Sequence, residues 1–168
     1  MPLTLILGGA RSGKTALGLA LTEAAAPRRL YIATAEALDA EMAARIARHK
    51  AERGPGWRTL EAPLDLASAL DAAEGEAVLV DCLTLWLSNL MHAEVDLEAA
   101  TTRMLGAVSG EVVIVSNEVG LGLVPETALG RAFRDAQGRL NQRVAARADR
   151  VAFVAAGLPI WLKGAPEL

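Results

Sequence analysis

The chain has 168 residues, of which 52% are hydrophobic and 22% charged, and its formal net charge is −3 at pH 7. This composition is typical of a single globular domain over residues 1–168 and excludes a disordered chain. A weakly negative charge provides no general basic surface for nucleic acid, so we expect no nucleic-acid partner.

One cysteine, Cys82, excludes an intramolecular disulfide and fits a reducing compartment. The apolar start of the chain is short and has no basic residues before it, so we expect a buried strand there rather than a signal peptide. No run approaches the roughly 20 apolar residues that a membrane span requires. We therefore expect a cytoplasmic protein with no membrane span.

Short runs of Val, Leu and Ile alternate with helical segments along the chain. These runs predict buried parallel strands at 3–7, 29–33, 77–81, 111–116 and 150–155. Helices are predicted over 14–26, 36–53, 64–74, 83–107 (with a break near 94–96) and 126–148. The run at 158–163 follows Gly157 too closely for a crossover, which predicts an antiparallel edge strand. The expected fold class is α/β, a three-layer sandwich around a mostly parallel sheet.

The strongest motif is GGARSGKT at residues 8–15, between the first predicted strand and the first predicted helix. It satisfies the phosphate-loop pattern G-x-x-x-x-G-K-[ST] in the context that this pattern requires, which argues against a chance match in a glycine-rich turn. The loop comprises Gly8, Gly9, Ala10, Arg11, Ser12, Gly13, Lys14 and Thr15. Lys14 is expected to reach the β- and γ-phosphates and Thr15 to ligate Mg²⁺. A nucleoside triphosphate site is predicted here.

Asp81 ends the predicted strand AVLVD, where such sites carry an acid that holds Mg²⁺ directly or through water. An acid in this position could instead cap the following helix. The two features predict a P-loop NTPase, which includes kinases, ATPases, GTPases and nucleotide-binding regulators.

The segment 36–53 has the periodicity of an amphipathic helix. At about 100° per residue its apolar stripe consists of Leu38, Met42 and Ile46, and a second row beside this stripe consists of Glu41, Arg45 and His49. Spacing alone favours a salt-bridged helix in which His49 covers the edge of the core. In the alternative, Arg45, Lys50 and Arg53 bind an anionic substrate and His49 is a nucleophile.

Four segments at characteristic distances resemble one known family. They are GGARSGKT, YIATAEALDAEMAARIARHKAERGPGWRTLEAP, VSNEVGLGLVPE and FRDAQGRLNQRVAARAD. Together they resemble the bifunctional cobinamide kinase/cobinamide-phosphate guanylyltransferases of cobalamin biosynthesis over nearly the whole chain. The resemblance implies a P-loop domain of the RecA type that assembles into homo-oligomers, expected to be homotrimers.

The resemblance also implies two reactions on one intermediate. ATP or GTP would phosphorylate adenosylcobinamide, and a histidine would then take GMP from GTP, release pyrophosphate and pass GMP to the cobinamide phosphate. His49 matches that histidine. The implied nucleotide contacts outside the loop 8–15 are Thr34, Ala35, Glu36, Lys50, Ala51, Glu52, Arg53, Glu61 and Asp81. Family members often have Glu at the Asp81 position.

Other polar residues keep two interpretations. Asn117 and Glu118 contact either substrate or a neighbouring subunit, or else they cap and brace their loop. Four arginines of the last helix form either a phosphate site or, as we favour, a solvated face; they are Arg131, Arg134, Arg139 and Arg143. His92 and Cys82 are interpreted as structural.

Two rival functions stay open from the residues alone. In a single-function P-loop small-molecule kinase, His49 would be structural. In a non-enzymatic nucleotide-binding module, the triphosphate would act as a switch. Only the resemblance speaks against both.

Overall fold

A computed structural model describes residues 2–36 and 39–165, without the side chains of Arg45, His49 and Glu52. Leu38 of the predicted apolar stripe lies outside the described residues. The side chains of Arg45, His49 and Glu52 lie outside them too, although their backbone belongs to a described helix. None of the helices described in 2–36 and 39–165 is long and apolar enough to cross a membrane.

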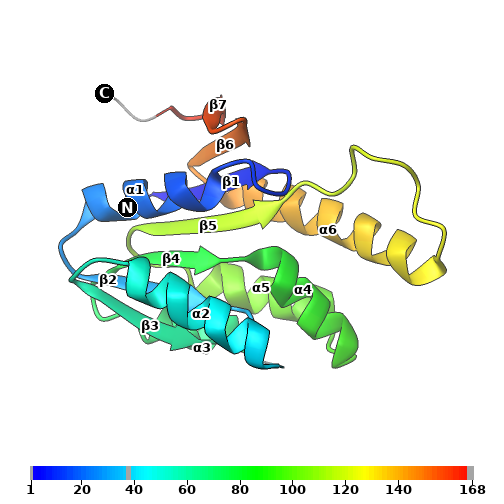
Figure 1. Cartoon of the computed structure of the whole chain (residues 1–168). Helices are drawn as coiled ribbons and strands as arrows, with labels where there is room; N and C mark the ends of the chain where they lie inside the picture. Colours follow the sequence, from blue (N-terminus) through cyan, green and yellow to red (C-terminus); the bar gives the residue numbers. More distant parts are fainter. Residues whose placement is uncertain (1, 37–38, 166–168) are drawn as a thin grey trace.

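The described elements alternate between strands and helices, except that α5 follows α4 and β7 follows β6 (Figure 1). The strands are β1 (Leu3–Gly8), β2 (Arg29–Ala33), β3 (Trp57–Glu61), β4 (Ala77–Asp81), β5 (Val112–Asn117), β6 (Arg150–Ala155) and β7 (Leu158–Lys163). The helices are α1 (Lys14–Ala25), α2 (Ala40–Glu52), α3 (Leu66–Asp71), α4 (Leu83–His92), α5 (Leu97–Ala107) and α6 (Ala128–Arg147).

The strands form one sheet in the order β3-β2-β4-β5-β1-β6-β7. All neighbouring pairs are parallel except β6 and β7, which are antiparallel, as predicted for the last strand. Two hydrophobic clusters cover the two faces of the sheet, one with α1 and one with α3, α4, α5 and α6. The predicted three-layer α/β sandwich is therefore confirmed.

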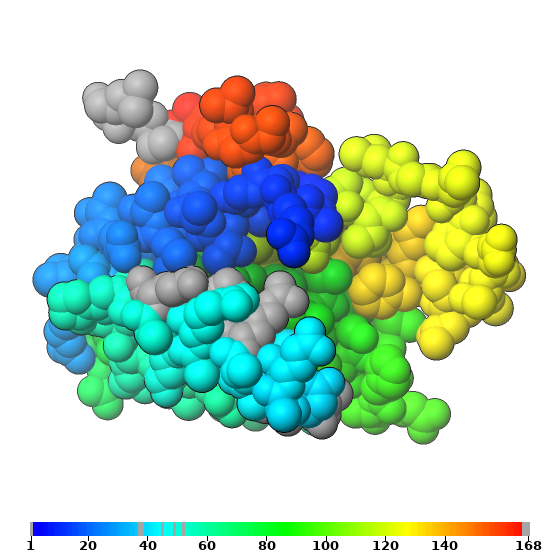
Figure 2. Space-filling model, in the orientation of Figure 1, coloured from blue at the N-terminus to red at the C-terminus, as the bar shows by residue number. Residues whose placement is uncertain are grey.

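The carboxyl ends of the parallel strands gather at one end of the molecule. Figure 1 shows the phosphate loop between β1 and α1, in dark blue, at the same end as the arrowhead of β5. The segment between β5 and α6, in yellow, stands out from the body at this end in the space-filling view (Figure 2). This geometry brings the segments after β1, β2, β4 and β5 toward one site.

Strand β3 was not predicted. Three of the five residues in its sequence WRTLE are polar, and its side chains are only partly buried or exposed. It pairs with β2 alone, at the edge of the sheet, so one side of its backbone and much of its side-chain surface face solvent. An edge strand of this kind lacks the continuous apolar pattern that identified the buried strands.

Helix ends also differ from their predicted positions. The helix predicted over 36–53 begins at Ala40, because the Asp39 side chain caps it by accepting a hydrogen bond from the Met42 N–H at 2.7 Å. The last helix was predicted to begin at residue 126 and begins at Ala128, behind the cap residue Thr127. The predicted break in 83–107 is confirmed, with α4 ending at His92 and α5 starting at Leu97.

A buried carboxylate beside the sheet leads to a first prediction. Glu76 is 8% exposed and receives two hydrogen bonds from Arg58, at 2.6 Å and 3.2 Å. The Arg58 hydrogen bonds hold the pKa of Glu76 below its ordinary value. We expect Glu76→Gln to lower the free energy of unfolding at pH 7 by about 1–2 kcal/mol, because the charge-assisted bonds are lost.

Denaturant titration at several pH values measures this effect. A carboxylate with a depressed folded-state pKa stabilises the fold above its unfolded pKa of about 4.3, and this contribution disappears as the pH falls through the folded value. The difference between Glu76→Gln and the wild type should therefore shrink below about pH 4. The matched control is Glu74→Gln at an exposed neighbour. Equal losses in the two variants would contradict the prediction.

Candidate active site

The loop Gly8–Thr15 has the backbone of a phosphate-binding turn. A Cβ on Gly8 would lie 2.6 Å from the Val154 carbonyl oxygen, so no larger residue fits there. Gly13 has a φ of 97° and forms the N-cap of α1, a conformation that favours glycine. Two bonds brace the loop: the Gly157 N–H donates to the Ser12 carbonyl at 2.8 Å, and the Glu118 N–H donates to the Gly8 carbonyl at 3.1 Å. The loop therefore holds the first turn of α1 toward the carboxyl end of the sheet.

Lys14, Thr15 and Asp81 meet at this turn. The Lys14 ammonium donates to the Gly9 carbonyl at 2.8 Å, which holds it over the loop. The Thr15 hydroxyl donates to Asp81 Oδ2 at 3.4 Å. Asp81 ends β4, whose register places it on the α1 side of the sheet beside Ala33. The structure thus brings together the three side chains predicted for phosphate and metal.

A hydroxyl and a carboxylate side by side are oxygen donors of the kind that Mg²⁺ prefers. Among the side chains that the structure describes, which exclude those of His49 and Glu52, no group of three or more His, Cys, Asp or Glu could hold a metal by itself. Such a pair fits a cation that keeps several waters and is shared with substrate phosphates, as Mg²⁺ typically is in phosphoryl-transfer sites. Thr15 and Asp81 are the residues that would hold it.

A buried tyrosine connects this acid to helix α2. The Tyr31 hydroxyl donates to Asp81 Oδ2 at 2.7 Å, and the ring is 9% exposed. The Arg53 guanidinium carbon lies 3.7 Å from the centroid of the Tyr31 ring, and Arg53 Nη2 donates to the Thr59 hydroxyl at 3.1 Å. Trp57 meets the same ring edge-on, at 6.2 Å between centroids.

Burial, reinforced by the Asp81 carboxylate, raises the pKa of Tyr31 above its ordinary value, so the phenol is protonated and acts as a donor. Burial also lowers the pKa of Arg53, although a guanidinium remains charged in proteins. Tyr31 was not among the residues singled out from the sequence. One signal was present, because the chain's single tyrosine lies in a buried aliphatic strand, where its hydroxyl needs a partner.

The residues after β2 have different surroundings. Thr34 is fully buried, and its hydroxyl donates to the Cys82 carbonyl at 2.7 Å and accepts from the Cys82 N–H at 2.9 Å. Its carbonyl accepts a hydrogen bond from the Asn89 amide at 2.8 Å. Thr34 therefore joins β2 to β4 and α4, whereas Ala35 is half-buried and Glu36 is exposed. A nucleotide contact at these three positions stays a prediction.

The predicted contacts from α2 and β3 lie further out along the sheet. Lys50 and Ala51 are exposed near the end of α2, where Arg53 is the C-cap residue. Glu61 pairs in register with Ala33, which pairs with Asp81, so Glu61 faces the same side two strands away, roughly 10 Å from Asp81 along the sheet. Tyr31 thus connects Arg53 to Asp81. Glu61 lies at the same carboxyl edge of the sheet as Asp81, two strands away.

Hydrogen bonds brace the chain at the end of β5 and just after it, those of Asn117 through its backbone and that of Glu118 through its side chain. The Asn117 N–H donates to the Thr84 hydroxyl at 2.9 Å, its carbonyl accepts from Asn141, and Glu118 Oε1 accepts from the Gly120 N–H. Gln137 donates to Ser116 and to Asn141, both at 3.0 Å, so a buried amide network holds the end of β5 against α6.

The other polar residues also have structural partners. Arg131 donates to two carbonyls of its own N-terminal loop, and Arg143 pairs with Glu98 at 2.6 Å. One ring nitrogen of His92 lies 2.8 Å from the Ser88 carbonyl. Burial raises the pKa of the Cys82 thiol, which disfavours a reactive thiolate. The His92 contact and the raised pKa of Cys82 agree with the structural interpretation of these two residues. Arg131 and Arg143 have partners within the fold, and the choice between a phosphate site and a solvated face for the arginines of α6 stays a prediction.

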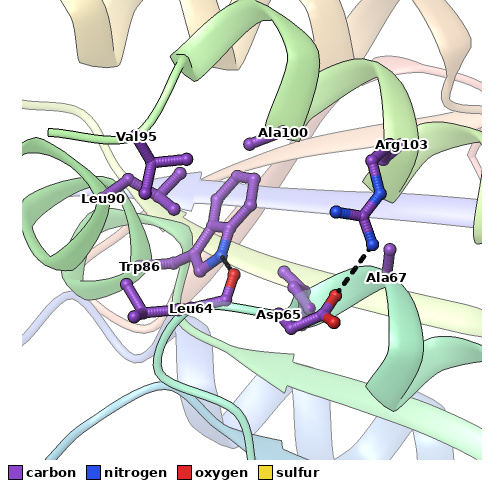
Figure 3. Close-up of a pocket in the computed structure, with 9 residues that line it drawn as sticks. Leu64, Asp65, Ala67, Trp86, Leu90, Val95, Ala100 and Arg103 are labelled. Atoms are coloured by element: carbon purple, nitrogen blue, oxygen red, sulfur yellow. Dashed lines mark hydrogen bonds and ion pairs between the residues drawn. The ribbon is translucent and has the colours of Figure 1, made fainter. Parts of the chain in front are cut away.

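The pocket drawn in Figure 3 lies between α3, α4 and α5, on the face opposite α1. Its walls include the Trp86 indole, which donates to the Leu64 carbonyl at 2.8 Å, and the Arg103–Asp65 ion pair at 3.3 Å. No residue of the phosphate loop lines it. The pocket is therefore separate from the candidate active site.

Comparison with known sequences identifies close relatives. The model of the family described as cobinamide kinase / cobinamide phosphate guanyltransferase matches residues 4–162. The chain is 50% identical to the bifunctional adenosylcobalamin biosynthesis protein CobP of Pseudomonas aeruginosa, over 96% of this chain and 98% of the relative. It is 44% identical to the bifunctional adenosylcobalamin biosynthesis protein CobU of Salmonella typhimurium, over 95% and 98% of the two chains.

Comparison with solved structures gives more distant matches. The flagellar accessory protein FlaH from Methanocaldococcus jannaschii matches with a TM-score of 0.54 and 13% identity, over 97% of this chain and 78% of that protein. The RadB recombinase matches with a TM-score of 0.53 and 16% identity, over 90% and 73% of the two chains. At these identities the likeness extends to the fold alone, and it agrees with the predicted P-loop NTPase architecture.

Proposed function

Because the chain belongs to the cobinamide kinase / cobinamide phosphate guanyltransferase family and is an enzyme of cobalamin biosynthesis, we propose that it performs both transfers at one phosphate site. The observation that carries the proposal is the meeting of Lys14, Thr15 and Asp81 at the phosphate loop, with the end of α2 joined to Asp81 through Tyr31. His49 lies in the last turns of that helix.

In the kinase step, the aminopropanol hydroxyl of adenosylcobinamide attacks the γ-phosphorus of ATP or GTP. A new O–P bond forms, the bond from the γ-phosphorus to the β–γ bridging oxygen breaks so that ADP or GDP leaves, and the hydroxyl proton passes to solvent. The loop amides and Lys14 hold the phosphates and balance the charge that develops on them. A divalent cation at Thr15 and Asp81 would supply further charge neutralisation.

In the guanylyl transfer, a ring nitrogen of His49 attacks the α-phosphorus of GTP and pyrophosphate leaves. A phosphate oxygen of adenosylcobinamide phosphate then attacks the same phosphorus, the N–P bond breaks, and adenosyl-GDP-cobinamide is released. A phosphoramidate is labile enough to pass its nucleotide on, and the covalent step divides one difficult transfer into two easier ones.

The proposed nucleotide site extends beyond the phosphate loop. It includes Thr34, Ala35 and Glu36 after β2, Lys50 through Arg53 at the end of α2, and Glu61 at the end of β3. Support comes from the sheet, which places the ends of β2, β3 and β4 in one row. A homotrimeric state stays a prediction from the family resemblance, and a cytoplasmic location stays a prediction from the sequence composition.

Incubation with GTP labelled at the α-phosphate tests the proposed mechanism. We expect label that stays on the denatured protein, is released by acid and survives base, as a phosphoramidate does. GTP labelled at the γ-phosphate is the control and should leave no label. The proposal fails if the protein turns over adenosylcobinamide phosphate and GTP without ever retaining α-label.

A further inference from the structure

We infer that Tyr31 is a positioning residue with two functions: its hydroxyl orients Asp81 toward the cation site, and its ring seats Arg53 at the end of the histidine-bearing helix α2. The inference rests on the proposed function, and it assigns a role to a side chain that touches neither nucleotide nor corrinoid in that proposal. Three elements meet at this one side chain: β4 through Asp81, α2 through Arg53, and β3 through Trp57.

The first function, which we call the hydroxyl arm, is orientation of Asp81 by the Tyr31 hydroxyl. It rests on which oxygen of Asp81 accepts the hydrogen bond. Tyr31 at 2.7 Å and Thr15 at 3.4 Å both donate to Oδ2. Neither of these bonds uses Oδ1, and in our inference Oδ1 ligates the cation. A carboxylate that ligates a metal is usually held by such a hydrogen bond, and losing the outer partner typically weakens metal affinity 10- to 100-fold.

The second function, which we call the ring arm, is positioning of Arg53 by the Tyr31 ring. It rests on the contacts that hold the Arg53 guanidinium. Its guanidinium lies 3.7 Å from the ring centroid, donates from Nη2 to Thr59 at 3.1 Å, and has an Nε that is buried without a partner in the described part of the chain. The Tyr31 ring therefore provides much of the surface against which the guanidinium packs. A cation–π contact that is shielded from water is among the stronger contacts of this kind. Because Arg53 is the C-cap residue of α2, seating it fixes that end of the helix.

Two substitutions separate the arms. Tyr31→Phe removes the hydroxyl and keeps the ring, and Tyr31→Leu removes both. Thr22→Val is the matched control, because it deletes another fully buried hydroxyl, bonded to the Gly18 carbonyl at 2.8 Å, without a link to Asp81. If Tyr31→Leu does not fold, Arg53→Lys tests the ring arm, because it keeps the positive charge but loses the planar stacking group.

The first readout is the affinity for Mn²⁺, measured by electron paramagnetic resonance in the presence of a non-hydrolysable GTP analogue. Tyr31→Phe should bind Mn²⁺ about tenfold more weakly than the wild type, while affinity for the analogue without metal is unchanged. Thr22→Val should match the wild type. Unchanged Mn²⁺ affinity in Tyr31→Phe would overturn the hydroxyl arm.

The second readout is amide hydrogen exchange of residues 40–52. Exchange should be faster in Tyr31→Leu and close to wild type in Tyr31→Phe and Thr22→Val, because only the first loses the seat of Arg53. The ratio of α-label retained to kinase rate should fall about tenfold in Tyr31→Leu alone. Equal exchange in the two Tyr31 variants would overturn the ring arm. Metal binding and hydrogen exchange do not require covalent labelling, so a wild-type protein that retains no label would refute the covalent mechanism and leave the Tyr31 test intact.

Discussion

His49→Ala is expected to retain no α-label from GTP, and its guanylyl transfer should fall by at least about a thousandfold, the scale on which loss of a catalytic nucleophile acts. The kinase rate should stay within about twofold of wild type, because hydroxyl attack on the γ-phosphate requires positioning and charge rather than the imidazole. Separate assays of phosphate transfer to adenosylcobinamide and of GMP transfer to adenosylcobinamide phosphate measure the two rates.

His92→Ala is the matched control, since His92 is the chain's other histidine. It lies at the end of α4 with a ring nitrogen against the Ser88 carbonyl, and its substitution should leave the label intact. The assignment of the nucleophile is wrong if His92→Ala loses the label while His49→Ala keeps it. Loss of both activities in a folded His49→Ala protein would instead contradict the division of roles.

Lys14→Ala is expected to slow both transfers by about 10²- to 10³-fold, because one ammonium serves phosphates in both reactions. Its position over the loop, 2.8 Å from the Gly9 carbonyl, places it where a triphosphate would bind. The two rates are measured with the same assays, and circular dichroism establishes that the variant is folded.

Lys163→Ala is the control, since it removes an ammonium that donates to the carbonyls of Ala145 and Ala148 near the end of α6, away from the phosphate loop. Both of its transfers should stay near wild type. If Lys14→Ala slowed only one of the two reactions, the transfers would use separate phosphate sites.

Much of the site could be predicted because its signals are local in sequence. The eight residues of the loop stand together, so their spacing identified the loop, and Asp81 stands at the end of a short aliphatic run, which made it a candidate for the metal with helix capping as the alternative. The buried strands could also be predicted from local sequence, because β1, β2, β4, β5 and β6 consist largely of apolar residues. Strand β3 lacked that pattern, since an edge strand needs no apolar outer face.

What the sequence by itself determined is the chemistry: a phosphate loop, an acid at a strand end, and a histidine in a charged helix, each specified by neighbours a few residues apart. Only the tertiary structure decided which of these meet. Thr15, Tyr31 and Asp81 come from three separate elements and Arg53 caps a fourth, and their contacts depend on β2 lying between β3 and β4. Strand order follows from how whole helices and strands pack, so residue patterns within one segment do not contain it.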